Sequence, residues 1–250
     1  MNRIILDPEE LKADGQAVLL TDARAAHLRR VLNVVPGQAV RVGLLDGPLG
    51  TGEVMRTEAS GVLLRCRWEP VVPNVPRVDL LLALPRPKVL KRLWSQLAAL
   101  GVGRVYVTNA ERVERNYFDT HVLEESFIRG QLIEGLQQCG DTRLPHVSVH
   151  RRLKVLLEDE LSAAAEGRER LVAHPGGGVR LSEFISAHHP GRVLVAIGPE
   201  GGWTEYELAL FEQHGFASVS AGERILRSDT ACLALLAILH EWMEFTTERA

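Results

Sequence analysis

The sequence predicts an α/β protein in which a small β-rich domain precedes a larger domain with a parallel sheet. Three observations support this prediction. Short apolar runs in the first 72 residues are separated by turn-forming residues, the segment EPVVPNVPR holds three prolines in nine residues, and strand-like runs then alternate with helix-like segments. Such alternation is typical of a parallel sheet covered by helices, and 250 residues suffice for two domains of this kind.

The N-terminal region is predicted to be a small β-barrel with one helix. A helix is expected over residues 21–32, with Ala26, Leu28, Val31 and Leu32 facing the core. Turn-forming pairs such as Pro36-Gly37 and Ser60-Gly61 separate the apolar runs that follow. These runs predict strands over residues 39–45, 52–56 and 61–68.

The region after the proline-rich linker is predicted to alternate strands and helices. The stretch VLVAIGPEGGWTEYE, residues 193–207, is typical: an apolar strand stops at a glycine-rich loop, and a helix begins with Thr204 as N-cap and Glu207 three positions later. We expect strands over residues 78–84, 105–108, 171–174, 193–197 and 217–219, and helices over 88–100, 123–138, 204–214 and the segment ending near 245.

Composition describes an ordinary globular chain with 46% hydrophobic residues and a net charge of −3. The N-terminus lacks an apolar signal segment, and no apolar run approaches the roughly 20 residues that span a bilayer, so a cytoplasmic protein with no membrane partner is expected. The three cysteines are widely spaced and form no CxxC pair, which predicts reduced thiols and no metal site.

Basic residues gather in one part of the sequence. Residues 77–115 hold eight Lys or Arg and three Asp or Glu, although the whole chain is slightly acidic. A local basic surface fits contact with a polyanion, whereas the alternative is a solvated helix face.

Three strand ends carry loops of glycine and small residues, at residues 174–178, 198–202 and 221–227. In a parallel sheet the carboxyl ends of the strands form the usual ligand site, and glycine lets backbone groups approach a ligand. The loop at 198–202 matches neither a Walker A loop nor GxGxxG, and Glu200 would repel a phosphate. A cationic ligand such as S-adenosylmethionine fits better, and the alternative is a strand-to-helix turn that binds nothing.

The segment IGPEGGWTEYE, followed by GERILRSDTA, resembles the SPOUT class of RNA methyltransferases. It resembles more closely the family that methylates N3 of a uridine in small-subunit (16S) ribosomal RNA. The resemblance covers the whole chain, because HLRRVLNVVPGQAVRVGLLDG is similar to that family's PUA-like RNA-binding domain. The segments KVLKRLWSQLAALGVGRVYVTNAERV and EGLQQCGDTRLPHV are similar to parts of its methyltransferase domain.

The resemblance implies a PUA-like RNA-binding β-barrel domain at residues 1–72 and a SPOUT methyltransferase domain with a trefoil knot at 73–250. It also implies a homodimer that uses S-adenosylmethionine and acts on small-subunit ribosomal RNA, within the assembled subunit. The cofactor-binding positions it implies are His174, Pro175, Ile197, Gly198, Pro199, Glu200, Gly201, Gly202, Ala221, Gly222, Ile225, Leu226, Arg227, Thr230 and Ala231.

Two residues are candidates for catalysis. Uracil N3 is a poor nucleophile while protonated, so Arg227 is a candidate to stabilise negative charge on the base, and Asp229 a candidate proton acceptor. Alternatively, Asp229 caps the last helix and Arg227 braces the fold or the dimer. The candidates for RNA binding are Arg24, Arg29, Arg30, Arg86, Lys88, Lys91 and Arg143.

The sequence departs from the family pattern at Ala99, Asp141, Ala221 and Asp229. Asp141 replaces a usual arginine, so a cation is missing at a position where RNA could lie. Two rival hypotheses remain open: a SPOUT enzyme with another RNA target, and an RNA-binding or ribosome-assembly protein without catalysis.

Overall fold

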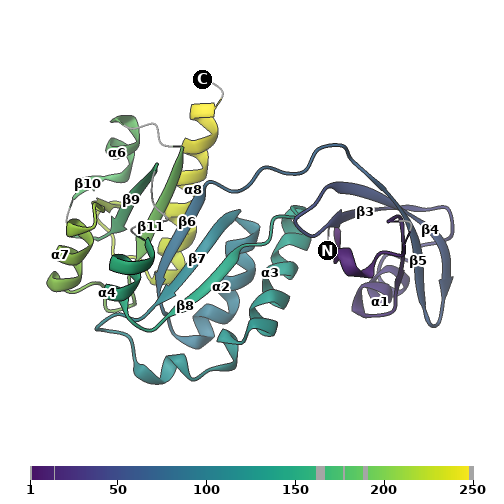
Figure 1. Cartoon of the computed structure of the whole chain (residues 1–250), viewed down its shortest axis with the longest axis horizontal. Helices are drawn as coiled ribbons and strands as arrows, with labels where there is room; N and C mark the ends of the chain where they lie inside the picture. Colours follow the sequence, from purple (N-terminus) through teal and green to yellow (C-terminus); the bar gives the residue numbers. More distant parts are fainter. Residues whose placement is uncertain (1, 14, 162–166, 177, 188–190, 248–250) are drawn as a thin grey trace. The chain divides into compact units, whose positions relative to one another are not determined.

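The computed structural model describes residues 2–13, 15–161, 167–176, 178–187 and 191–247. The chain forms two compact units (Figure 1). The first unit comprises Met1–Val75 together with Ile133–Leu144, and the second comprises Pro76–Leu132 and Pro145–Ala250. Residues 69–77, the predicted linker, form neither helix nor strand.

The first unit is built on a five-stranded sheet with the strand order β1-β3-β4-β5-β2. β1 pairs with β3 in parallel, and the other pairs are antiparallel. The three predicted strands are present, and β4 is longer than expected. β1 and β2 were not predicted, because each is too short to show a period. The elements are β1 (Ile4–Leu6), a 3-10 turn (Pro8–Glu10), β2 (Ala17–Leu20), α1 (Ala23–Arg30), β3 (Ala39–Leu44), β4 (Leu49–Glu58) and β5 (Gly61–Trp68).

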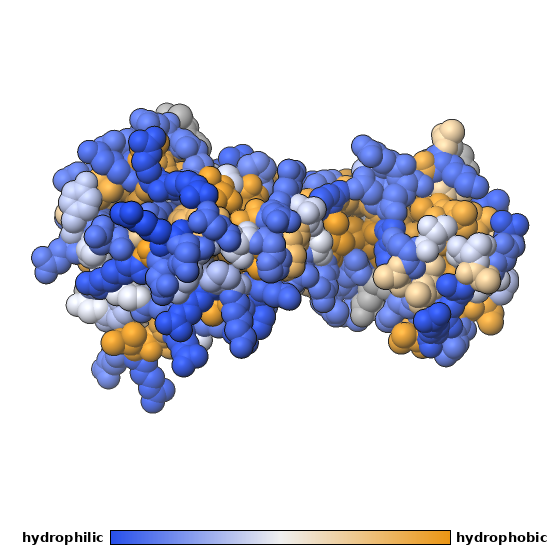
Figure 2. All heavy atoms as spheres, turned by 90° about the horizontal axis from the view of Figure 1, so that it is seen from below, coloured by the Kyte–Doolittle hydropathy of each residue, from blue (hydrophilic) through white to orange (hydrophobic). Residues whose placement is uncertain are grey.

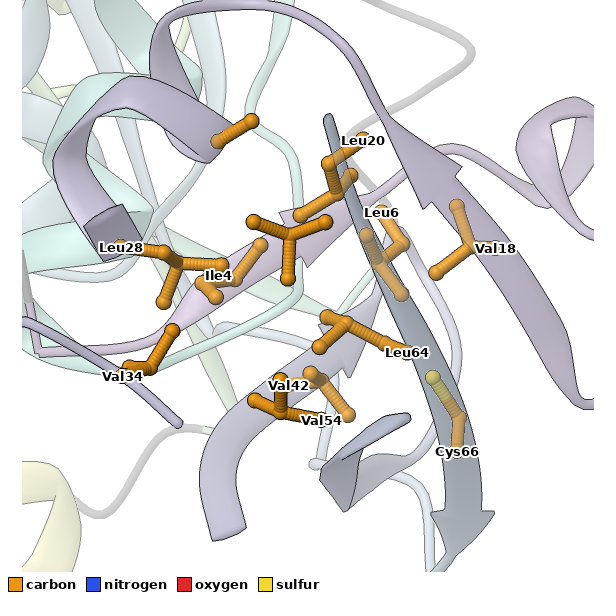
Figure 3. Packing of buried hydrophobic residues seen from close by; sticks show 12 residues of the cluster. Ile4, Leu6, Val18, Leu20, Leu28, Val34, Val42, Val54, Leu64 and Cys66 are labelled. Atoms are coloured by element: carbon orange, nitrogen blue, oxygen red, sulfur yellow. The ribbon is translucent and has the colours of Figure 1, made fainter. Parts of the chain in front are cut away.

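Alternating apolar side chains of these strands form the core of the first unit (Figure 3). Leu6, Val42 and Leu64 are fully buried at its centre. The prediction for α1 was wrong in detail. The helix ends at Arg30, so Ala25 and Leu28 face the core, while Val31 and Leu32 lie beyond the helix and are 62% and 46% exposed.

A cluster of charges joins α1 to the start of the chain. The guanidinium of Arg24 forms ion pairs with Glu10 and Asp22 and donates a hydrogen bond of 2.8 Å to the Ile5 carbonyl. Burial alone would raise the pKa of Glu10 and of Asp22, but the hydrogen bonds and charge of Arg24 outweigh it and lower both pKa values. Arg24 therefore stabilises the first unit from inside.

The second unit is built on a seven-stranded sheet with the order β10-β12-β9-β11-β6-β7-β8, and every neighbouring pair is parallel. This confirms the predicted parallel α/β fold. All six residues of β6 are buried, as expected for a central parallel strand. The strands are β6 (Val78–Ala83), β7 (Val102–Thr108), β8 (His146–His150), β9 (Arg168–Ala173), β10 (Val179–Arg180), β11 (Arg192–Ile197) and β12 (Ala217–Ser220).

Helices cover the parallel sheet. α2 and α8 pack against each other, α2 also contacts β7, and α8 contacts β6 and β11. α7 packs on β12, and its predicted capping box between Thr204 and Glu207 is present. The helices are α2 (Pro87–Ala99), α3 (Glu125–Cys139), α4 (Leu153–Val155), α6 (Leu181–Ala187), α7 (Glu205–Gln213) and α8 (Ser228–Thr247), with 3-10 turns at Arg115–Phe118 and His121–Leu123 and a π-helical turn at Leu156–Glu160.

One face of the molecule is mostly polar. On the face drawn in Figure 2, hydrophilic residues predominate and hydrophobic ones form separate areas among them. Within the described residues, no helix combines the length and apolarity that a membrane span requires. The three cysteines are free thiols, and burial raises the pKa of Cys66 to about 11.

We predict that Arg24→Ala lowers the free energy of unfolding of the first unit by about 1–3 kcal/mol at pH 7, because three acceptors lose a charged donor. Glu10 and Asp22 have lowered pKa values, so their contribution is present at neutral pH and is lost as the pH falls from the ordinary carboxyl range through these lowered pKa values. Urea denaturation at pH 7 and pH 3, followed by hydrogen exchange of β5 amides, measures the difference.

Arg30→Ala is the matched control, because Arg30 is exposed on the same helix. An Arg24→Ala penalty that is the same at both pH values would contradict an electrostatic role.

Candidate functional site

A pocket of about 420 Å³ lies at the carboxyl edge of the parallel sheet. The loops after β9, β11 and β12 enclose it, as the sequence predicts, because these strands are neighbours in the order β12-β9-β11. We call it the carboxyl-edge pocket. The predicted cofactor positions that line it are His174, Pro175, Ile197, Gly198, Pro199, Glu200, Gly201, Gly202, Ala221, Gly222, Ile225, Leu226 and Ala231.

Two predicted cofactor positions, Arg227 and Thr230, do not line this pocket. Both lie at the start of α8 with exposed side chains. The pocket also has lining residues outside the set of predicted cofactor positions, although Gly176 and Arg224 belong to the predicted glycine loops. Ala173, Val219 and Leu235 add apolar wall, and further lining comes from Arg112, Gly176, Trp203, Arg224 and Ser228.

The absence of a side chain at Gly198 leaves room for the aromatic ring of Trp203. A Cβ atom at this position would lie 3.2 Å from two atoms of the Trp203 indole. Trp203 is 4% exposed and packs edge-on against Phe211, with ring centroids 4.8 Å apart. Trp203 therefore both lines the pocket and anchors the loop to α7.

The absence of a side chain at Gly201 leaves room for the side chain of Arg112, which comes from the loop after β7. A Cβ at Gly201 would lie 3.0 Å from Arg112 Cδ and 3.1 Å from its Cβ. Arg112 Nη1 also donates a hydrogen bond to the Gly201 carbonyl. The sequence could not indicate this partnership, because the two residues are 89 positions apart.

Glu200 has a backbone partner. Its Oε1 accepts a hydrogen bond of 3.2 Å from the N–H of Arg86, the N-cap residue of α2, whose own side chain makes no capping bond. A carboxylate at a helix N-terminus is favoured by the helix dipole. Glu200 thus lines the pocket and caps α2 at the same time.

Glu207 fixes the other end of the glycine loop. The residue Glu207 is 5% exposed. Its carboxylate accepts hydrogen bonds from Thr204 N at 2.8 Å, Thr204 Oγ1 at 3.0 Å and Glu111 N at 2.8 Å. The loops after β7 and β11 are therefore joined by Glu207 as well as by Arg112.

The candidate catalytic residues lie at the start of α8. Asp229 Oδ1 accepts a hydrogen bond of 2.9 Å from Thr230 N, and Asp229 Oδ2 lies 3.5 Å from Arg92 Nη2 on α2. The neighbouring Ser228 Oγ donates a 2.9 Å bond to the Gly198 carbonyl, which ties α8 to the glycine loop. Arg227 is exposed, and its carbonyl accepts the first helical bond, from Ala231 N.

The candidate RNA-binding residues divide into two groups. In the first, Arg24 has its carboxylate partners, Arg29 donates to the carbonyls of Glu58 and Ala59, and Arg143 donates to those of Pro73 and Asp46. The remaining residues, Arg30, Arg86, Lys88 and Lys91, have exposed side chains.

Asp141 is used within its own turn. Its Oδ1 accepts bonds from the backbone N–H groups of Thr142 and Arg143, at 2.5 and 3.1 Å. The departure from the family pattern at this position therefore has a local structural role.

Fold and site together define a parallel α/β domain with a small-molecule pocket at the carboxyl edge of its sheet, lined largely by glycine loops. Residues 73–240 of the chain match the protein family described as RNA methyltransferase domain. The chain belongs to this family of SPOUT-class RNA methyltransferases, which confirms the resemblance seen in the sequence.

Relatives match over nearly the full length. The chain is 31% identical over 250 residues to ribosomal RNA small subunit methyltransferase E of Treponema pallidum, covering 97% of this chain and 93% of that protein. It is 24% identical over 235 residues to the methyltransferase E 1 of Borreliella burgdorferi, covering 94% and 95%. The crystal structure of the Neisseria gonorrhoeae methyltransferase E bound to S-adenosyl methionine is similar, with a TM-score of 0.78, 25% identity and coverage of 96% and 97%.

We predict that Glu207→Ala lowers the free energy of unfolding of the second unit by about 2–4 kcal/mol, because buried N–H groups of Thr204 and Glu111 lose their acceptor. Urea denaturation measures the change, and hydrogen exchange of the Glu111 amide should accelerate with it. Glu205→Ala is the matched control, since Glu205 is exposed in the same helical turn. Equal stability of the two variants would show that the buried carboxylate contributes nothing.

Proposed function

We propose that this protein transfers a methyl group from S-adenosylmethionine to N3 of a uridine in small-subunit (16S) ribosomal RNA. The observation that carries the proposal is the carboxyl-edge pocket, built by the glycine loops of a chain that belongs to an RNA methyltransferase family. The named relatives are methyltransferases of small-subunit ribosomal RNA, and one of their crystal structures holds S-adenosyl methionine.

The lining of the pocket fits this cofactor. Its volume of about 420 Å³ lies in the range of ligand sites, which is roughly 300–1,000 Å³. The apolar walls at Ala173, Val219 and Leu235 suit an adenine ring, and backbone groups of the glycine loops suit its polar edge. The Glu200 carboxylate favours a ligand with positive charge over a phosphate.

When bound, S-adenosylmethionine supplies an electrophilic methyl group on a sulfonium. The protein then has to hold the uridine and assist loss of the N3 proton. In this proposal Arg227 stabilises negative charge on a uracil oxygen, and Asp229 accepts the N3 proton directly or through water. Asp229 contacts Thr230 N and Arg92, and both contacts serve equally the alternative role of a charge at the helix start.

RNA binding is assigned to exposed cations. Arg86 precedes α2 as its N-cap residue, and Lys88 and Lys91 lie in the N-terminal half of this helix, which also holds Arg92, the partner of Asp229. Phosphate contacts by such residues position an RNA without reading its sequence. Arg30 is the corresponding candidate of the first unit, which we interpret as a PUA-like RNA-binding domain.

The trefoil knot belongs to the same proposal. It is supported by the place of β11 in the sheet. β11 lies between β9 and β6, which both come before it in the sequence and which are separated from each other there by β7 and β8. It is supported too by α8, which contacts β6 and β11 and bonds through Ser228 to the loop after β11. A homodimer is proposed from the family resemblance, and a cytoplasmic location from the reduced thiols that the cysteine pattern predicts.

Methyl transfer is the direct test. With labelled S-adenosylmethionine we expect N3-methyluridine in unmodified small ribosomal subunits, identified by nucleoside analysis, and little label in tRNA. Naked ribosomal RNA is the comparison that reports whether the assembled subunit is required. Cofactor binding without transfer to any of these RNAs would favour the non-catalytic RNA-binding alternative, and label at another nucleoside would favour a different RNA target.

A second prediction concerns how the glycine loop is shaped. Gly201→Ala should weaken S-adenosylmethionine affinity about 10-fold or more, because the new Cβ meets Arg112 at about 3.0 Å and displaces the loop. Arg112→Gly removes both the Cδ and the Cβ atoms that the new side chain meets, so Gly201→Ala should cost much less affinity in the Arg112→Gly background than in the wild type. Calorimetric titration of the four proteins completes the double-mutant cycle.

If the effects of the two substitutions on affinity were additive, glycine at position 201 would be required so that the backbone can approach the ligand, and not because it leaves room for Arg112. Gly215→Ala is unsuitable as a control because its φ is +75°, whereas Gly130→Ala in α3, with open space around it, is suitable.

A further inference from the structure

A second cavity of about 580 Å³ lies beside the carboxyl-edge pocket, and we call it the side pocket. It is formed by the loop after β7, the start of α4 and the first turns of α7, all within the second unit. The residues that matter below are Asn109, Glu111, Arg115, Lys154, Thr204 and Tyr206.

The two pockets share one wall. The segment Gly201–Trp203 lines the carboxyl-edge pocket, and Thr204, the next residue, lines the side pocket. This wall is held by the bond from Arg112 to Gly201 and by the Glu207 carboxylate, which binds Thr204 and Glu111. A ligand in the side pocket would thus be separated from a ligand in the carboxyl-edge pocket by this one segment.

Tyr206 gives the side pocket an aromatic surface. Its side chain lies in the first turn of α7 and is 66% exposed, whereas most aromatic residues of this unit are buried. A single exposed aromatic residue is common on protein surfaces. At the rim of a cavity, however, its ring is available for stacking, and every nucleic acid base offers a flat face to stack on it.

Charge and polarity complete the chemistry of a nucleotide site. Arg115 and Lys154 line the same cavity with exposed cationic side chains. Glu158 Oε1 lies 3.6 Å from Lys154 Nζ. Exposed ion pairs of this kind are weak, so the Lys154 cation stays available to a ligand. The Glu207 carboxylate is occupied by its three hydrogen bonds, so Glu111 is the one exposed acid among the residues that line the pocket.

We infer that the side pocket binds a nucleotide of the RNA substrate that neighbours the methylated uridine, with its base stacked on Tyr206 and its phosphate near Arg115 and Lys154. The inference rests on the proposed function, because it takes the target uridine to lie at the carboxyl-edge pocket. It adds an RNA contact within a few residues of the carboxyl-edge pocket, and this contact is separate from the basic half of α2.

Tyr206→Ala tests the stacking. The variant should raise the Kd and the KM for the RNA about 10-fold, within the range of roughly 5- to 150-fold that loss of one stacked base gives. Tyr206→Phe keeps the ring and should restore RNA binding, while the affinity for S-adenosylmethionine stays unchanged in both variants. Unchanged KM and Kd in Tyr206→Ala would overturn the inference.

Lys154→Ala and Arg115→Ala test the phosphate contact. Each should weaken RNA binding and reduce the slope of log K against log salt by about 0.7 for a single-stranded segment. Arg180→Ala is the matched control, because Arg180 is an exposed cation of the same unit that lines neither pocket. A slope that changes equally in the control would count against the side pocket.

Crosslinking gives a readout that does not depend on activity. RNA carrying 4-thiouridine next to the target position should crosslink to a peptide that contains Tyr206. Methyl transfer by the wild type with crosslinks only to other peptides would overturn the inference and leave the proposed function standing. If the wild type neither bound nor methylated the RNA, the proposed function itself would fail, and the inference with it.

Discussion

The site depends on the pairing of β11 with strands on both of its sides. β11 forms parallel ladders with β9 and with β6, and its residues from Val193 to Ile197 are buried. A strand held in this way has little freedom to shift register, because a slip by one residue would exchange its two buried faces. The glycine loop that follows β11 therefore starts from a fixed point, and the loops after β9 and β6 start from fixed points beside it.

Hydrogen bonds from outside the loop then decide its shape. Glu200 binds the start of α2, Arg112 binds the Gly201 carbonyl, and Ser228 binds the Gly198 carbonyl. The glycines serve this arrangement in a specific way: Gly198 makes room for Trp203, and Gly201 makes room for Arg112. A pocket wall that is already fastened loses less conformational entropy when a ligand binds, which raises affinity without any new contact.

The sequence predicted those features that local chemistry determines. The capping box of Thr204 and Glu207 and the bounds of β5 follow from residues close together in the chain. The convergence of the three glycine loops follows from the parallel sheet, because the carboxyl ends of parallel strands meet at one edge. β1, β2, β8 and β10 were missed, since each has five residues or fewer and is defined by a distant partner. Arg112 was missed as a pocket residue for the same reason. Arg24 and Arg29 could not be told from free cations, because Glu10 and the carbonyl groups of Glu58 and Ala59, which accept from them, lie 14 or more positions away.

The shared wall between the two pockets has an energetic consequence. Glu207 binds Thr204 on one side and Glu111 on the other, so any displacement of the Gly201–Thr204 segment is felt in both pockets. If a ligand in one pocket holds this segment in the position that the other ligand requires, each ligand raises the affinity of its partner by the same factor. The buried Trp203 ring and the bonds of the buried Glu207 carboxylate at this wall favour such coupling, because a packed segment shifts between discrete positions and does not deform gradually.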